Sequence, residues 1–151
     1  MDFATTDLLL AILHHLLIFA LAGVLAFEIA AVRTGMTGTD VRRVARVDLW
    51  YGILAGAILI VGFTRVNVAA KGWAYYSVNP FFWMKMLSFG IVGLLSLLPT
   101  FALLHWKNQA AAKADFVVAD KDVRRVRRIL WAEAGFFALI LVFAAMMARM
   151  S

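Results

Sequence analysis

The chain carries an apolar run from Leu8 to Phe27 that contains two histidines but no charged residue. A run of about 20 apolar residues is the length of helix that crosses the hydrocarbon core of a bilayer. In lipid the backbone amides and carbonyls must be hydrogen-bonded within the segment, so a run of this kind folds as a helix. The sequence therefore predicts a membrane-spanning helix near the N-terminus.

The composition places the whole chain in the same class. It is 64% hydrophobic with a mean hydropathy of +0.87 and a formal charge of +6, which is more apolar material than one small soluble core can bury. The absence of cysteine excludes disulfides, thiolate metal ligands and thiol catalysis. Residues 1–7 contain two acids and no basic residue, so we expect the first helix to be retained and not cleaved as a signal peptide.

Three further spans follow from hydropathy and from the breaks between apolar runs. Asp40 is a candidate cap for the second helix, whose apolar part covers 49–63, and Pro99 should kink the third. The stretch 66–80 holds Gly, Asn, Pro and aromatic residues and is predicted to be an interfacial loop. The predicted fold is all-α, an integral membrane four-helix bundle of two antiparallel hairpins in one domain, 1–151. The expected helices cover about 6–32, 40–63, 80–106 and 122–147.

Basic residues predict the orientation of this bundle. Eleven of the fifteen lie in or beside the two connections, 33–46 and 107–128. The positive-inside bias makes that side cytoplasmic and places both termini outside, as in a multi-pass protein of the bacterial inner (cytoplasmic) membrane. The basic clusters lack interleaved aromatic residues, so we interpret them as lipid headgroup contacts and expect no nucleic-acid partner.

An internal repeat supports the two-hairpin arrangement. The segment DVRRVARV at 40–47 recurs as DVRRVRRI at 122–129, each time at the start of the second helix of a hairpin. Two hairpins of the same orientation imply a parallel repeat about an axis along the membrane normal. Convergence on an acidic cap followed by basic residues at the headgroups is the alternative explanation.

One layer of polar residues is expected near the outer face. His14 and His15 point about 100° apart on a helix, so only one of them can face the bundle centre. His14 shares a helical stripe with Glu28, whereas His15 shares one with small alanines, and we favour His14 as the inward residue. The other candidates that would line an outer pocket with the histidines are Arg65, Lys71, Lys85, Met146 and Met147.

A second polar layer is expected near the cytoplasmic face. Its members are Glu28, Asp48, Tyr51, His105 and Glu133. Three carboxylates and an imidazole suit Mn, Fe or Zn, so Glu28, Asp48, His105 and Glu133 are a second-choice metal site. We favour instead a hydrogen-bonded network or ion pairs with Arg33, Arg46 and Arg128. No Glu-x-x-His occurs in the chain, which argues against a ferritin-like dimetal bundle.

Several motifs resemble those of known families. ILHHLLIFALAGVLAFE, DLWYG, GFTRV, AKGWAYYSVNPFFWMKM and LLPT resemble a family of bacterial predicted membrane proteins known only as a domain of unknown function. More distantly, the Leu-His of the first helix and the aromatic segment around Lys85 resemble HemJ-type protoporphyrinogen oxidases and CopD-like copper-resistance membrane proteins. That resemblance implies a haem-binding helical bundle in which His14 or His15 is an axial ligand. Trp83 stands where the resemblance would place a second histidine.

Two classes of function follow, and the sequence leaves open whether the protein is an enzyme. The first is a redox membrane protein that holds haem b, with His14 or His15 and a second His or Met, such as Met146 or Met147, on the iron. Arg65, Lys71 or Lys85 would pair with the propionates, and a quinone or a redox protein would be the partner. The second is a non-enzymatic bundle, a transporter subunit or scaffold, that binds an anion, lipid or metal ion. Either could form a homo-oligomer.

Overall fold

The computed structural model describes residues 3–68 and 72–149. Four of its helices are long and apolar enough to cross a membrane, which confirms the predicted all-α membrane bundle. Two of the helices are longer at their C-terminal ends than the sequence predicts. The helix α2 continues past residue 63, and α4 continues past residue 106. The helices are α1 (Phe3–Ala31), α2 (Gly38–Val68), α3 (Gly72–Ser77), α4 (Pro80–Ala112) and α5 (Asp120–Arg149).

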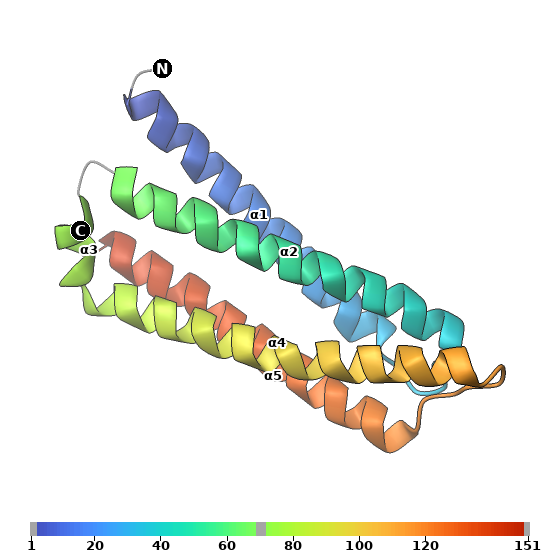
Figure 1. The fold of residues 1–151 in the computed structure, drawn as a ribbon. Helices are drawn as coiled ribbons and strands as arrows, with labels where there is room; N and C mark the ends of the chain where they lie inside the picture. The colour runs from blue at the N-terminus through green and yellow to red at the C-terminus, as the bar shows by residue number, and fades with distance from the viewer. Residues whose placement is uncertain (1–2, 69–71, 150–151) are drawn as a thin grey trace.

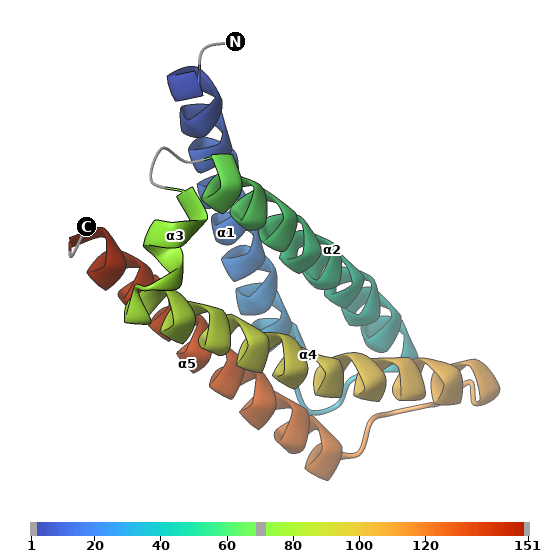
Figure 2. The ribbon, with the colours of Figure 1, turned by 60° about the vertical axis from the view of Figure 1, so that its left-hand side comes forward.

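The long helices form two antiparallel hairpins, α1 with α2 and α4 with α5, which contact each other through α2 with α4 and α1 with α5. The ends of the chain and α3 lie together at one end of the bundle, and the two connections, 32–37 and 113–119, lie at the other (Figure 1). Toward the first end the two hairpins diverge (Figure 2). We call this the open end, and the opposite one the loop end.

The stretch 66–80 is not a loop throughout, which corrects the sequence prediction. It contains the last turn of α2 and the short helix α3. Two contacts hold α3 against the start of α4. The indole N–H of Trp83 donates to the carbonyl of Ser77 at 2.8 Å. The ring of Trp73 packs edge-on against the ring of Phe82, with 6.0 Å between the ring centres. Aromatic side chains that predicted an interfacial loop therefore stabilise a helix there.

The starts of α2 and α4 are capped by side chains. The Asp40 carboxylate accepts hydrogen bonds from the Thr37 amide and hydroxyl, both at 3.0 Å, while the Asp40 amide donates to the Thr37 hydroxyl at 3.4 Å. This is a reciprocal capping box, so Thr37 is the cap and Asp40 its partner. At α4 the Asn79 side chain accepts from the Phe81 amide at 2.9 Å. Further along, the ribbon of α4 bends about halfway (Figure 1), and Pro99 lies inside this helix.

The loop end is closed by apolar packing. The two connections meet there, because the Val118 amide donates to the Met36 carbonyl at 3.0 Å and Thr37 forms an isolated β-bridge with Val117. Around this junction α2, α5 and both connections bury apolar side chains to 3% exposure or less. We call this group the apolar seal. Its members are Val32, Met36, Val41, Val44, Val118, Val123 and Val126.

Burial repeats in register between the two hairpins. In α2 the buried side chains include Val41, Val44, Asp48 and Tyr51, and at the matching positions of α5 they are Val123, Val126, Leu130 and Glu133.

The outer surface of the bundle is apolar, with Phe19, Ile60 and Leu94 each at least 70% exposed. An exposed apolar surface of this extent is the surface that a bilayer covers.

Candidate ligand pocket and buried carboxyl layer

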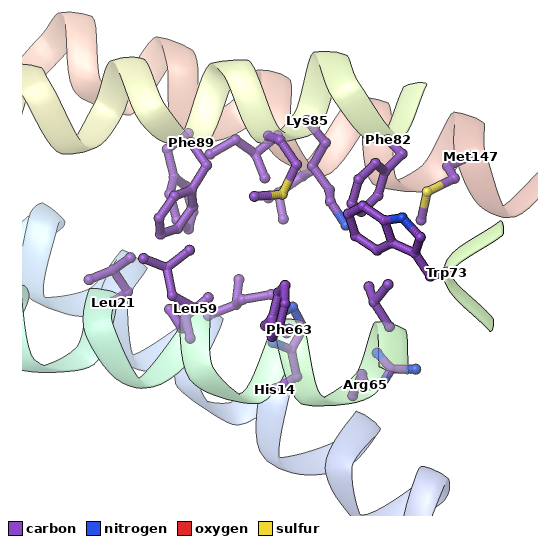
Figure 3. Close-up of a pocket in the computed structure, with 18 residues that line it drawn as sticks. His14, Leu21, Leu59, Phe63, Arg65, Trp73, Phe82, Lys85, Phe89 and Met147 are labelled. Carbon is purple, nitrogen blue, oxygen red and sulfur yellow. The ribbon is translucent and has the colours of Figure 1, made fainter. Parts of the chain in front are cut away.

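A cavity of about 220 Å³ lies between the diverging hairpins at the open end. All five helices contribute to its wall (Figure 3). On α4 the lining residues follow the spacing of one helical face, which is i, i+3, i+4 and i+7. The pocket residues that matter below are His14, Gly62, Phe63, Arg65, Trp73, Phe82, Lys85, Met86, Phe89 and Met147.

The structure distinguishes the two histidines. His14 lines the pocket, and its Nδ1 is buried without a hydrogen-bond partner. His15 is exposed on the outer side of α1, and its Nδ1 lies 2.7 Å from the Ala11 carbonyl of the same helix. The ring of His14 approaches α2 where that helix has no side chain, since a Cβ on Gly62 would lie 3.2 Å from its Cε1. His14 is therefore the imidazole that a bound molecule could reach.

Arg65 brings one positive charge to the pocket wall. Its Nε lies 3.7 Å from Oδ1 of Asp7 on α1, which is an ion pair too long to be a hydrogen bond. Both side chains are about one third exposed. The charge count of residues 1–7 did not identify Asp7 as a partner of Arg65. Two residues of opposite charge at the open ends of α1 and α2 were the available signal.

Lys85 brings the second positive charge from the opposite side of the cavity. Lys85 extends from α4 toward the cavity, while His14 and Arg65 lie on the α1 and α2 side (Figure 3). Its Nζ lies 5.5 Å from the centre of the Phe82 ring, within the range of a cation–π contact. Phe82 is buried, so it fixes one wall of the pocket and the direction of the lysine.

The two adjacent methionines near the end of α5 differ in their position relative to the pocket. Met147 lines the pocket, whereas Met146 is exposed. Met86 also lines it, although its position beside Lys85 was not recognised as part of the site. The spacing from Phe82 and Lys85 to Met86 was a sequence signal for this shared face. Lys71 lies outside the described residues.

The second polar layer forms deep in the bundle, but without His105. Glu28, Asp48, Tyr51 and Glu133 are each 8% exposed or less, and we call them the carboxyl layer. His105 is exposed, because α4 turns Pro99, Leu103 and Trp106 inward and leaves the intervening position outside. Within residues 3–68 and 72–149, no three His or acidic side chains are placed to hold a metal ion. The predicted second-choice metal site of Glu28, Asp48, His105 and Glu133 is therefore not assembled in this structure.

The favoured ion pairs with arginine are also absent. Arg33, Arg46 and Arg128 are exposed at the loop end, and none forms an ion pair with a carboxyl of the layer in the part of the chain that the structure describes. Among the described residues, a hydrogen bond joins the layer to α4, where the hydroxyl of Thr100 donates to Oδ1 of Asp48 at 2.9 Å. The predicted network is thus realised only at Asp48.

Four apolar helices long enough to cross a bilayer, paired as two hairpins around internal polar groups, define a polytopic integral membrane protein. The family model described as "Predicted membrane protein (DUF2214)" matches residues 6–150, and the chain belongs to this family. No curated protein and no solved structure matches the chain significantly. The resemblance to HemJ-type and CopD-like proteins is not shown by these comparisons.

Proposed function

We propose that the pocket at the open end binds haem b, with His14 as a ligand of its iron, and that the protein is a redox protein of the bacterial inner membrane. The observation that carries this proposal is the Nδ1 of His14, buried in an otherwise largely apolar pocket without a hydrogen-bond partner. A buried polar atom without a partner is costly, and a metal ligand is one way to satisfy it. Neutral imidazole ligates iron without bringing charge into hydrocarbon.

The other lining residues fit the remaining parts of a haem. Phe63, Phe82 and Phe89 provide apolar walls for a flat ring. Arg65 and Lys85 provide two cations for two propionates, as charge-assisted hydrogen bonds require. Met86 and Met147 each place a thioether on the wall, which could supply the second iron ligand.

The shape of the pocket sets a condition on its occupant. About 220 Å³ is below the usual volume of a ligand pocket, roughly 300–1,000 Å³. However, several lining residues, such as Phe63, Trp73 and Met86, are themselves exposed, so the pocket opens to the surface of the bundle. A porphyrin would therefore fill both the enclosed part and this opening.

When bound, haem b would supply a one-electron carrier near one face of the membrane. The protein would hold the group in place, exclude water with its aromatic wall, and compensate its negative charges with Arg65 and Lys85. A membrane quinone or a redox protein at the open end would be the electron partner. Whether the protein is an enzyme depends on that partner.

The test compares two adjacent histidines as matched variants. Purified wild-type protein, produced with ample haem, should show a reduced-minus-oxidised haem difference spectrum. His14→Ala should abolish the spectrum, whereas His15→Ala should leave it nearly intact, since His15 faces away from the pocket. Equal loss in both variants, or a colourless wild-type protein, would contradict the proposal.

A second candidate occupant is an anionic lipid or another amphipathic anion. The exposed apolar side chains at the rim of the pocket favour it, because a lipid could enter sideways between α2 and α4 and meet Arg65 and Lys85. Two observations would distinguish the lipid from haem. The purified protein would be colourless, and mass spectrometry of the native complex would detect bound anionic lipid. In that case Lys85→Met should release the lipid and His14→Ala should not.

A further inference from the structure

Three helices of the bundle place carboxyl groups in one buried layer, well separated from the pocket. Glu28 lies on α1, Asp48 on α2 and Glu133 on α5. On α1 the pocket extends as deep as Leu21, which leaves about 10 Å along the helix to Glu28 at the helical rise of 1.5 Å per residue. Leu25, 3% exposed, lies between them on the same helix. The layer is therefore a separate feature and does not depend on what the pocket binds.

The groups of the layer are buried on helices that pack against one another. Glu28, Asp48 and Glu133 are each 8% exposed or less, and α1, which carries Glu28, packs against both α2 and α5. Tyr51 lies three residues after Asp48 on α2 and is 4% exposed. Like charges in a medium of low dielectric repel strongly, so these three acids cannot all be ionised without compensation.

Compensation by cationic side chains is missing around the layer. On the elements that pack there, the titratable groups that face it are Glu28 from α1, Asp48 and Tyr51 from α2 and Glu133 from α5, while α4 contributes the Thr100 hydroxyl. The nearby arginines of α2 are exposed, and Arg43 lies over the Phe27 ring at 5.6 Å. No basic residue forms an ion pair with the layer in residues 3–68 and 72–149.

Three oxygen atoms of the layer have no hydrogen-bond partner although they are fully buried. They are Oε1 of Glu28, Oε1 of Glu133 and the hydroxyl oxygen of Tyr51. Their side chains are 2%, 1% and 4% exposed. Buried polar atoms without a partner are rare in native proteins, and an unpartnered carboxyl group is less costly to bury in its protonated, neutral form than as a carboxylate. These atoms are the independent sign that the layer binds something.

We propose that the carboxyl groups of Glu28, Asp48 and Glu133, with Tyr51 beside them, form a proton-binding site inside the membrane, in which at least one carboxyl group is protonated at neutral pH. A proton suits the site because a single carboxyl oxygen can hold it, whereas a metal ion needs a set of ligands that is not assembled among the described residues. The proton also removes the repulsion that three ionised carboxylates would create.

The surroundings make this a site that exchanges its proton only in a controlled way. Toward the loop end the apolar seal closes the bundle, with Val32, Met36 and Val41 completely buried. Toward the open end, Leu25 is buried next to the layer, and Ile58 forms part of the pocket wall on that side. Acidic residues inside membrane bundles are costly and typically mark proton or ion pathways.

Infrared spectroscopy of the full-length protein in lipid nanodiscs at pH 7 tests the proposal. We expect the carbonyl-stretch band of a protonated carboxylic acid, which should shift after exchange into D2O. The substitutions Glu28→Gln, Asp48→Asn and Glu133→Gln keep size and hydrogen-bonding capacity, and at least one of them should remove the band or reduce it. Asp115→Asn is the matched control, because Asp115 is exposed in the connection before α5 and should not contribute.

A chemical measurement on the wild-type protein covers the case in which a variant does not fold. Dicyclohexylcarbodiimide enters membranes and reacts with protonated carboxyl groups. It should label Glu28, Asp48 or Glu133 at neutral pH and leave Asp115 unmodified, as read by peptide mass spectrometry. A wild-type protein with neither a protonated carboxyl band nor label in the layer would overturn the proposal, as would a band that persists in all three folded variants.

Discussion

The imidazole of His14 lies against the backbone of α2 at Gly62, where an added Cβ would be 3.2 Å from the histidine Cε1. That distance is tighter than an ordinary van der Waals contact, so any side chain at position 62 must displace the ring or the helix. The pocket thus depends on a glycine of one helix to hold the imidazole of another. The direction of the histidine is a property of the α1–α2 pair and not of α1 alone.

Substitution of this glycine should therefore affect the pocket more than the fold. We expect Gly62→Ala to lower haem affinity about tenfold, roughly 1.4 kcal/mol, because the ring of His14 must move. Thermal stability should change by less than about 1 kcal/mol, since alanine favours the helix. Gly56→Ala is the control, because a Cβ there meets nothing within 4 Å. Equal haem affinity in both variants, measured by spectral titration, would contradict the prediction.

Lys85 should act on the ligand more than on stability. Lys85→Met keeps the unbranched stem of the side chain as far as Cε but removes the charged ammonium group that faces the cavity beside Phe82. We expect affinity for haem or another anionic occupant to fall about tenfold, while Lys85→Arg retains it. Binding is measured by titration and stability by thermal denaturation in detergent. Lost stability with unchanged binding would mean that Lys85 only anchors α4 at the membrane surface.

The two members of the Asp7–Arg65 ion pair should have opposite effects on an anionic ligand. The pair is partly exposed, so its contribution to stability should be below about 1 kcal/mol. Asp7→Asn leaves Arg65 free to pair with the ligand and should raise its affinity, whereas Arg65→Met should lower it. Both are measured with the same titration. A decrease in both variants would show that the ion pair itself builds the pocket.

Thr100 should stabilise the contact between the two hairpins. Its hydroxyl oxygen lies 2.9 Å from Oδ1 of Asp48 across α4 and α2 and 3.0 Å from the Ser96 carbonyl of its own helix, so its single proton has two acceptors. Thr100→Val keeps the shape and leaves a buried acid without this donor, so we expect a loss of about 1–3 kcal/mol in unfolding experiments. Ser96→Ala is the comparison, because that hydroxyl donates to the Gly93 carbonyl of its own helix at 2.8 Å. It should cost less than about 0.5 kcal/mol.

Orientation in the membrane is tested with reporter fusions. Basic residues cluster at the loop end, so we expect that end to face the cytoplasm. A fusion of alkaline phosphatase after Ser151 should be active, because it would lie outside, and a fusion at Ala114 should be inactive. Green fluorescent protein at the same two positions should give the reverse pattern. Activity at Ala114 would invert the assignment of the two faces.

Much of the architecture could be predicted because its determinants are local. Apolar runs of sufficient length give helices in lipid whatever their neighbours, and the turns between them follow from Gly, Pro and capping residues. The four spans, the two hairpins and the candidate residues of both polar layers were therefore within reach of the sequence. The extent of α3 was not, because it depends on Trp83 reaching back to the Ser77 carbonyl.

The tertiary structure alone decided which polar groups meet. His14 and His15 differ by one residue and about 100°, and the packing of α1 against α2 and α5 places His14 at the pocket and His15 on the exposed side. Similarly, Arg46 and Asp48 lie close together in sequence, yet one is exposed at the loop end and the other buried between helices. Hydropathy reports how deep a residue lies along the membrane normal, whereas the direction of its side chain around the helix is set by the neighbouring helices.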